Sequence, residues 1–233
     1  MKDYLKGLPW FLAAVIVLVS IGYLIERWRR RDLEKWAVEQ GGRFEGGGIL
    51  DEIPVPEAAP FDANPGKDRI TYNNVIRIER PEATYVLAQY YHQFLDTKNT
   101  AQSFSCVVCF VTLPAGEWPE VRVYRPMADV FGIMDKILPN PPVPVPGASP
   151  AFAAAFEARA VKGASSPDPA ALSRLLPAAV QTELLSSEDL IAGLVVRGRT
   201  VRVQAVGQVT GYPHQKVFEA VRRMAGAWTP SRP

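Results

Sequence analysis

Histidine and cysteine are scarce in this chain of 233 residues, which contains two of each. The cysteines, Cys106 and Cys109, form a single C-x-x-C pair, and no second cysteine or histidine pair lies within sequence reach to complete a zinc site. His92 falls in an aromatic segment, and His214 follows a proline at an expected helix start, where capping or exposure is the usual role. The sequence therefore predicts no metal site and no catalytic histidine.

Enzyme motifs are missing as well. The sequence contains no G-x-S-x-G elbow, no Walker-type loop, no dinucleotide-binding glycine fingerprint and no H-E-x-x-H zinc motif. Acidic pairs such as Asp51-Glu52 and Glu188-Asp189 are adjacent in sequence, so they do not converge on one point. A formal net charge of +2 does not favour a nucleic-acid partner. We therefore expect no catalytic residues, no cofactor, no nucleic acid and no identifiable small-molecule substrate.

Residues 8–25, in contrast, form an apolar run without a single charge. About 18 helical residues at about 1.5 Å each cover about 27 Å, close to the hydrocarbon thickness of a bilayer. Bulky residues lead straight into charge, unlike the cleavage site of a signal peptide, so we expect an uncleaved anchor in the lipid bilayer. Trp10, Tyr23 and Trp28 suit the headgroup level at the two ends of this anchor.

Charges around the apolar run predict its orientation. Four arginines follow it and two lysines precede it: Arg27, Arg29, Arg30 and Arg31, against Lys2 and Lys6. Because positive residues are retained on the cytoplasmic side, we expect the N-terminus outside and the C-terminal domain in the cytoplasm, at the inner (cytoplasmic) membrane. The run offers no ionisable group for a proton relay and no Gly-x-x-x-Gly spacing for close helix packing. Simple anchoring by a single-pass helix is the prediction.

Glycine and proline divide the rest of the chain. Strong helix formers continue to Gly41-Gly42, so residues 1–40 are expected to form the transmembrane helix and a membrane-proximal extension. In that extension we expect Trp28, Leu33 and Trp36 to lie against either lipid or the domain. Residues 41–70 are rich in glycine and proline and predict an extended linker or strap. We expect residues 71–228 to form the soluble domain and residues 229–233 a short tail.

Strand-like segments predominate in the expected domain. Runs rich in β-branched and aromatic residues predict strands at residues 74–79, 84–94, 103–113, 120–125, 190–197 and 200–206, the last two flanking a turn at Gly198-Arg199. Helices are expected at residues 127–137, at residues 169–185 with a break before Pro177, and at residues 212–228. Local connections without βαβ alternation favour an α+β fold with an antiparallel sheet and a few helices.

Two segments need closer argument. Alanines in residues 152–160 favour a helix, but the spacing of Phe152, Phe156, Ala158 and Ala160 fits one face of a strand, which we predict. The C-x-x-C pair lies within the expected strand at residues 103–113. Residues three apart on a strand point to opposite faces, so we expect two buried core cysteines whose thiols diverge.

Two features suggest recognition of a partner. Residues 139–150 are expected to be extended. Docking the proline-rich run at residues 139–146 would therefore cost less chain entropy than docking an ordinary loop; a rigid connector is the alternative. The C-terminal part is locally basic and suits anionic headgroups or an acidic partner face, with a solvated surface as the alternative. The candidate residues are Pro139, Pro141, Pro142, Pro144, Pro146, Arg197, Arg199, Arg202, Arg222 and Arg223.

The arrangement of these features resembles a group of uncharacterised bacterial single-pass membrane-anchored proteins with a β-rich cytoplasmic domain. The shared features are the single N-terminal span with its arginine-rich exit, Trp36-Ala37, then Gly42 and Phe44, and finally Asn74-Val75-Ile76 ahead of the β-rich part. The resemblance implies a fold and a location but no activity.

Two functions fit the sequence. The first is a non-enzymatic accessory or scaffold subunit that packs on other membrane protein subunits through its helix, its proline-rich straps and its cytoplasmic domain. A respiratory or photosynthetic energy-transducing complex is one host compatible with this, although no residue selects it. The second is a membrane-tethered enzyme or small-ligand sensor whose pocket on the sheet is lined by Tyr90, Tyr91 and His92.

Overall fold

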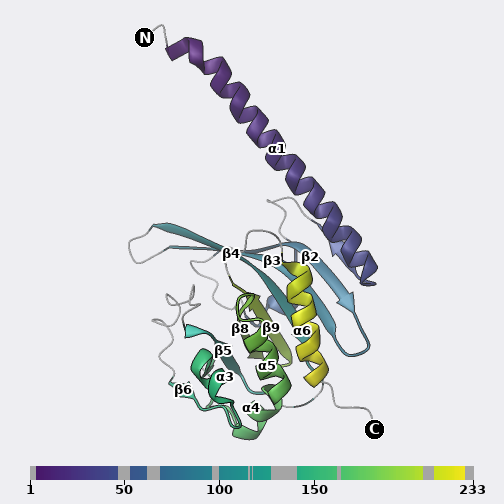
Figure 1. Cartoon of the computed structure of the whole chain (residues 1–233), viewed down its shortest axis with the longest axis vertical. Helices are drawn as coiled ribbons and strands as arrows, with labels where there is room; N and C mark the ends of the chain where they lie inside the picture. Colours follow the sequence, from purple (N-terminus) through teal and green to yellow (C-terminus); the bar gives the residue numbers. More distant parts are fainter. Residues whose placement is uncertain are drawn as a thin grey trace.

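The computed structural model describes residues 4–46, 53–61, 69–95, 100–114, 116, 118–126, 141–161, 164–206 and 213–228. The fold is α+β, as the sequence predicts: one long apolar helix precedes an antiparallel nine-stranded sheet with a few helices. Helix α1 extends away from the domain, and only its C-terminal part reaches the sheet (Figure 1). The helix expected at residues 127–137 and the site residue Pro139 lie outside the described residues.

The sheet has the order β1-β2-β3-β4-β9-β8-β5-β7-β6, with antiparallel pairing throughout. Its strands are β1 (Arg43–Glu45), β2 (Arg69–Glu79), β3 (Thr84–Leu95), β4 (Ala101–Thr112), β5 (Val121–Tyr124), β6 (Pro142–Val143), β7 (Glu157–Ala160), β8 (Ile191–Arg197) and β9 (Thr200–Ala205). The predicted hairpin is present between β8 and β9, where Gly198 has a φ of 56°. Edge strands β1 and β6 escape sequence-based prediction because they span only three and two residues.

The helices are α1 (Tyr4–Glu39), the 3-10 helix η1 (Pro56–Ala58), α3 (Pro150–Ala155), α4 (Pro169–Leu175), α5 (Ala178–Ser186) and α6 (His214–Trp228). Helix α4 begins where the side chain of Asp168 accepts a hydrogen bond from the backbone N–H of Ala171 at 2.9 Å. Pro177 separates α4 from α5, because a proline within a continuous helix removes a backbone donor and clashes with the preceding turn. The predicted break before Pro177 is confirmed.

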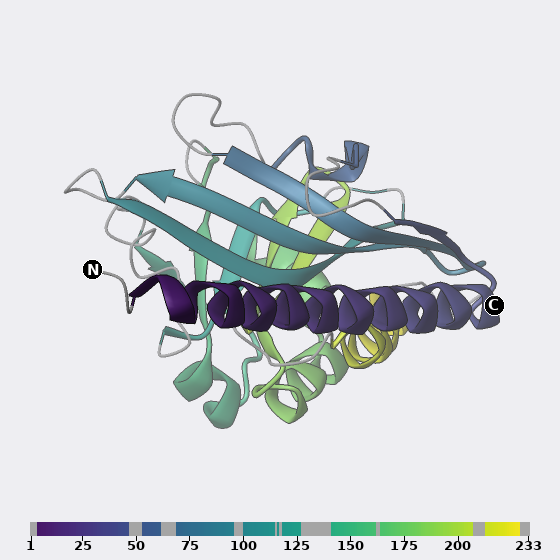
Figure 2. The same cartoon turned by 90° about the horizontal axis from the view of Figure 1, so that it is seen from above.

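Strand alternation gives the sheet two apolar faces. On the face that we call the helix side, the strands pack against α3 to α6 and the C-terminal part of α1. On the opposite face, the strap side, residues 53–61 lie across the sheet, and we call this segment the strap. Val55 and Ala58 of the strap are buried in one cluster with Tyr72 and Phe110. The helices and the strap lie on opposite sides of the sheet in Figure 2.

The strand expected at residues 152–160 is wrong in its first half. Pro150–Ala155 forms helix α3, and only Glu157–Ala160 forms a strand. Ser149 caps the helix by accepting a hydrogen bond from the backbone N–H of Phe152 at 3.2 Å, and a proline occupies the first turn. A capping serine followed by proline is a strong helix start, and it outweighs the alternation that favoured a strand.

Exposure of His214 is also a wrong expectation. The side chain is fully buried at the start of α6, in the same element as buried Val217 and Phe218. Because α6 is amphipathic, its first residue shares the face that packs on the sheet.

Parts of the stretch expected as an extended linker or strap, residues 41–70, form strands of the sheet. Strand β1 pairs with β2, and β2 itself begins at Arg69. The proline-rich run is likewise divided: Pro142 and Val143 form an edge strand, and Pro150 begins α3.

Candidate functional site

The membrane anchor is the first candidate site. Within the described residues, one helix is long and apolar enough to cross a membrane, the stretch Trp10–Glu39 of α1, and no part of its most apolar window is buried. Trp10, Tyr23 and Trp28 are all largely exposed, as residues at a headgroup boundary would be. Arg27, Arg29 and Arg31 are exposed, whereas Arg30 turns to the carboxylate of Glu26 at 3.4 Å.

The C-terminal part of α1 is packed into the domain. Leu33, Trp36 and Ala37 are buried in the helix-side core, and Ala37 has no exposed surface. The Trp36 ring meets Phe218 of α6 edge to face, with ring centroids 5.5 Å apart. Trp36 therefore lies against the domain, and the same helix that carries the apolar run contributes side chains to the globular core.

A tight glycine cap joins α1 to the sheet. Gly41 has a φ of 67°, its N–H bonds to the carbonyl of Val38 at 2.8 Å, and the N–H of Gly42 bonds to the carbonyl of Ala37 at 2.8 Å. This pair of bonds is a Schellman motif. A Cβ on Gly42 would lie 2.5 Å from the backbone oxygen of Arg77, so only glycine fits here. The chain passes from helix to β1 within three residues, Gln40 to Gly42.

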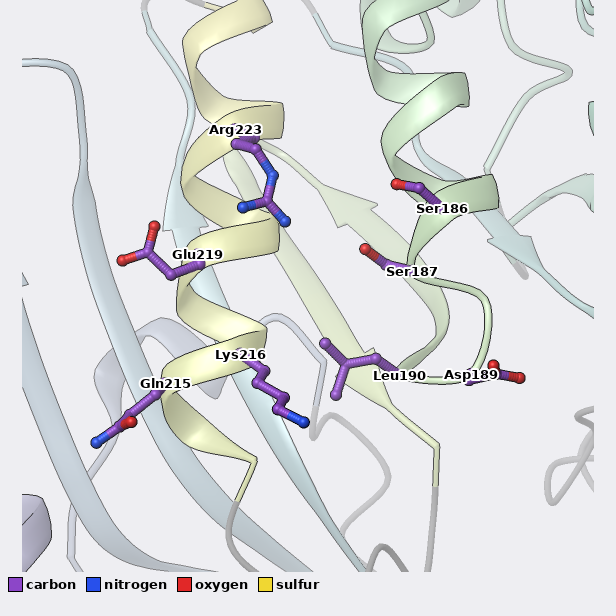
Figure 3. A pocket seen from close by; sticks show the side chains of 8 residues that line it. All are labelled: Ser186, Ser187, Asp189, Leu190, Gln215, Lys216, Glu219 and Arg223. Atoms are coloured by element: carbon purple, nitrogen blue, oxygen red, sulfur yellow. The ribbon is translucent and has the colours of Figure 1, made fainter.

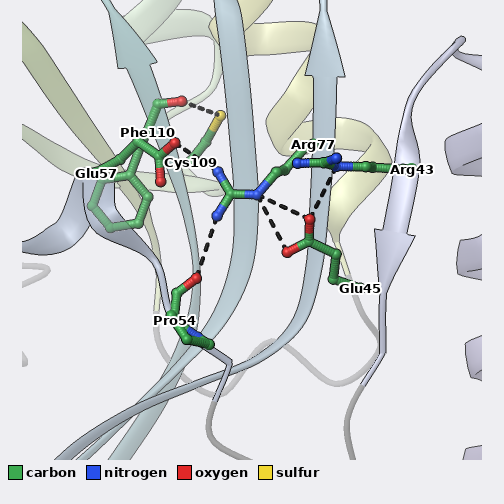
Figure 4. A network of polar contacts seen from close by, with 7 residues as sticks. All are labelled: Arg43, Glu45, Pro54, Glu57, Arg77, Cys109 and Phe110. Atoms are coloured by element: carbon green, nitrogen blue, oxygen red, sulfur yellow. Dashed lines mark hydrogen bonds and ion pairs between the residues drawn. The ribbon is translucent and has the colours of Figure 1, made fainter.

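An ion-pair network fastens β1 and the strap to β2 (Figure 4). The guanidinium of Arg77 contacts Glu45 of β1 at 3.2 Å and Glu57 of η1 at 2.6 Å, and it donates to the carbonyl of Pro54 at 3.3 Å. Burial alone would lower the pKa of Arg77, but the hydrogen bonds and charges of Glu57 and Glu45 outweigh it and raise the pKa. Three segments that are distant in sequence are thus held by one side chain.

The candidate arginines do not form one patch. Arg197 and Arg202 are on the strap side: Arg197 donates to the carbonyl of Pro60 at 2.8 Å, and Arg202 lies over the rings of Phe61 and Tyr90 at 5.1 and 5.8 Å. Arg199, at the hairpin turn, donates to the carbonyl of Leu113. Arg222 and Arg223 are on α6, on the helix side, where they pair with Glu219 at 3.4 Å and Glu183 at 2.8 Å.

The candidate prolines that the structure describes lie at the opposite edge of the sheet from β1. Pro142 belongs to β6, opposite Arg159 of β7, and Pro146 lies in a turn. Pro141 and Pro144 flank the strand. This run is therefore the outermost part of the sheet, and its separation from Arg222 and Arg223 means that the two predicted recognition features do not share one surface.

The cysteines and the aromatic strand are buried. Cys106 belongs to the strap-side cluster and Cys109 to the helix-side core, which confirms that their thiols diverge. Burial raises the pKa of Cys106 to about 12, and it raises the pKa of Cys109 as well. Tyr90 and His92 are buried on the strap side with ring centroids 5.9 Å apart, whereas half-buried Tyr91 alternates to the other face.

A pocket of about 400 Å³ opens between α5 and α6, far from these aromatics in sequence (Figure 3). It is lined by Ser186, Ser187, Asp189, Leu190, Gln215, Lys216, Glu219 and Arg223. Arg223 of α6 donates to the carboxylate of Glu183 of α5 at 2.8 Å and so joins the two helices. Ser187, at the C-terminal end of α5, donates to the same carboxylate at 2.8 Å. Hydrogen bonds from Arg223 and Ser187 outweigh the effect of burial and lower the pKa of Glu183. This arrangement fits a structural seam between two helices.

Several residues at these sites are not among the candidates named from the sequence. Arg77, Arg122 and Arg159 each alternate with apolar residues on a strand, and that pattern points their side chains away from the helix-side core. This signal can be read from the sequence. The partners of Arg77 cannot be read from the sequence, because Glu45 and Glu57 lie 32 and 20 residues before it.

Comparisons with known proteins identify no family for this chain. No protein-family model and no curated protein matches the chain. Among solved structures, the chain is similar to the crystal structure of the mycobacterial trehalose monomycolate transport factor A, TtfA, with a TM-score of 0.47 and 14% sequence identity. The match covers 89% of this chain and 99% of that one. A likeness of this degree carries no function from one protein to the other.

Proposed function

We propose that the chain is a non-enzymatic, membrane-anchored accessory or scaffold subunit of a larger membrane protein complex. Its helix crosses the inner membrane once with the N-terminus outside, and the α+β domain lies in the cytoplasm next to the bilayer. Strap, sheet and helix together hold the domain against neighbouring subunits. The host complex is an assembly of other membrane proteins, for which an energy-transducing complex remains one candidate.

The observation that supports this proposal is the continuity between anchor and domain. Leu33, Trp36 and Ala37 of α1 are part of the domain core, and the Schellman cap at Gly41 leaves no free linker between helix and sheet. A tethered enzyme that samples soluble substrates gains from a flexible joint. A subunit that must present a surface to fixed neighbours gains from a rigid one, because a preorganised surface loses less conformational entropy on binding.

The test is extraction of the native chain in mild detergents, followed by native gel electrophoresis and native mass spectrometry. We expect a species heavier than the protomer that contains at least one further membrane protein in constant stoichiometry. The test variant is Trp36→Ala, which leaves the apolar run intact but loosens the junction. It should weaken the complex while the chain still inserts into the membrane. A chain that runs at protomer mass in several detergents and in nanodiscs would contradict the proposal.

A further inference from the structure

The pocket between α5 and α6 contains more than the contact that joins the two helices. Its volume of about 400 Å³ lies in the range of small-ligand sites, about 300 to 1,000 Å³. The bonds among Glu183, Ser187 and Arg223 explain how the helices are joined. They do not explain the other side chains that line the pocket.

Arg223 is held in position and keeps unused donors. Its Nε and one Nη donate to the two carboxylate oxygens of Glu183, each at 2.8 Å. A guanidinium carries five N–H groups, so three remain. Within the described part of the chain, no other acceptor is bonded to this guanidinium. Because the group is already fixed, an anion that binds to it costs little further conformational entropy.

Lys216 adds a positive charge that no described residue pairs with. It is exposed in the first turn of α6, seven residues before Arg223, so the two cations share one face of the helix about two turns apart. Lys216 forms no ion pair or hydrogen bond with the residues that the structure describes. Residues 207–212, which precede α6 in the sequence, include no acidic residue.

The acidic side chains at the pocket are directed elsewhere. Figure 3 shows Glu219 and Asp189 pointing away from the space between the helices, whereas Arg223 and Lys216 extend from α6 toward Leu190. Glu219 pairs with an arginine of its own helix at 3.4 Å. Leu190 is half-buried and gives the pocket an apolar wall. The pocket therefore offers two cations beside an apolar surface.

We propose that this pocket binds the phosphate group of a small organic ligand. The phosphate oxygens accept hydrogen bonds from Lys216 and from the unused N–H groups of Arg223, and the organic part of the ligand lies on Leu190. A phosphate suits two cations that approach from different turns of a helix, because it presents three acceptor oxygens in a tetrahedral arrangement. A carboxylate presents two in one plane. This binding function is additional to the accessory role and does not depend on it.

A soluble ligand is the expected source of the phosphate. Phe218, two residues after Lys216, packs on Trp36 of α1. Trp36 follows Ile25, the last residue of the apolar run, by 11 residues, or about 16 Å of helix. The headgroup layer extends only about 5 to 7 Å beyond the hydrocarbon. A lipid that stays in the bilayer therefore does not reach the pocket when α1 stands upright.

The experiment follows thermal unfolding of the full chain in phosphatidylcholine nanodiscs, by tryptophan fluorescence, while phenyl phosphate is added at constant ionic strength. Phenyl phosphate combines the phosphate with an apolar ring, and benzyl alcohol is the uncharged comparison. A ligand that binds the folded state raises the melting temperature in a concentration-dependent way. We expect a saturable rise with phenyl phosphate and none with benzyl alcohol.

Two variants test the named contacts. Lys216→Gln should raise the apparent Kd for phenyl phosphate at least about fivefold, because it removes a charge-assisted hydrogen bond. Ser186→Asp should weaken binding at least as much, since it adds a carboxylate to the pocket and leaves the bonds between Arg223 and Glu183 in place. Lys35→Gln, at an exposed lysine of α1, is the matched control and should bind as the native chain does.

Each outcome decides the proposal. No saturable rise in the native chain, unchanged binding in Lys216→Gln, or an equal loss in Lys35→Gln would overturn it. The melting temperature without ligand reports folding, and we expect it to be unchanged in Lys216→Gln because this side chain is exposed. Nanodiscs rich in phosphatidylglycerol identify the source of the phosphate. Phenyl phosphate binding that persists there supports a soluble ligand, whereas loss of binding there assigns the pocket to a lipid phosphate.

Discussion

At the scale of single residues, Arg77 of β2 joins two segments that are distant from it in sequence, β1 and the strap. Its side chain is only 13% exposed, and its guanidinium is held by Glu45, Glu57 and the carbonyl of Pro54. An arginine buried to this degree is tolerable because its partners satisfy both its charge and its donors. Loss of either carboxylate would leave that charge poorly compensated and would free one of the two segments from β2.

The two cysteines permit a test of strand geometry. We expect Cys106→Ala and Cys109→Ala each to lower the free energy of unfolding by about 1 to 2 kcal/mol, because each removes a buried apolar sulfur. The double variant should lose about the sum, since the side chains lie in different clusters on opposite faces of the sheet. Urea denaturation of the chain in detergent measures this. Stoichiometric zinc, or a double variant no less stable than either single one, would show that the pair acts as a unit.

Ionisation of the Cys106 thiol makes the stability of the domain depend on pH in the alkaline range. The pKa of Cys106 is raised from 9.0 to about 12 by burial, so the folded state keeps the proton where the unfolded state loses it. The stabilisation is complete below about pH 9 and is lost as the pH rises towards 12. Native protein at pH 8 should therefore react with iodoacetamide only as fast as it unfolds, and denatured protein at once. Rapid labelling of the native chain would contradict the buried placement.

At the scale of elements, the junction between α1 and β1 is the most constrained connection. We expect Gly42→Ala to lower the stability of the domain by about 1 to 3 kcal/mol through overpacking. The new Cβ would lie 2.5 Å from the backbone oxygen of Arg77 and 2.7 Å from the side chain of Ile78, and a backbone atom cannot swing aside. Gly22→Ala is the matched control, because no atom lies within 4 Å of its added Cβ. Equal stability of the two variants, measured by thermal unfolding, would mean that the junction is looser than the geometry requires.

The contact between α5 and α6 predicts that the stability of the domain falls at acid pH. Glu183 has a pKa below its ordinary value, because hydrogen bonds from Arg223 and Ser187 outweigh burial. The stabilisation is therefore present above the unfolded pKa of about 4.3 and is lost as the pH falls through the lower folded pKa. Glu183→Gln should cost about 1 kcal/mol at pH 7, a modest value since Arg223 is largely exposed, and almost nothing near pH 2. Glu219→Gln, at an exposed helix pair, is the control and should change little at either pH.

At the scale of the whole molecule, anchor and domain form one body, so the orientation of the helix also fixes the side of the membrane on which the domain lies. We expect replacement of Arg27, Arg29, Arg30 and Arg31 by neutral residues to give mixed or inverted topology, because Lys2 and Lys6 then carry the larger positive count. Protease protection in membrane vesicles measures this. A single unchanged cytoplasmic orientation of the quadruple variant would refute the account.

The sequence by itself determined the features that depend on short-range patterns. Eighteen uncharged residues predict a span whatever follows them, alternating β-branched residues predict the long strands, and Pro177 predicts the break between α4 and α5. The divergence of Cys106 and Cys109 follows from the two-residue period of a strand alone.

Tertiary structure decided what depends on distant partners. Trp36 had lipid or the domain as its possible environment, and the ring of Phe218, 182 positions later, places it in the core. Residues 43–45 become a strand because they pair with β2. The strap is held on the sheet because Arg77 and Arg197 beneath it donate hydrogen bonds to Glu57 and to the carbonyl of Pro60. Arg202, Arg122 and Arg159 come onto one line across the sheet only through the register of four strands. Contacts of this kind form when chain ends far apart in sequence meet, so no local pattern encodes them.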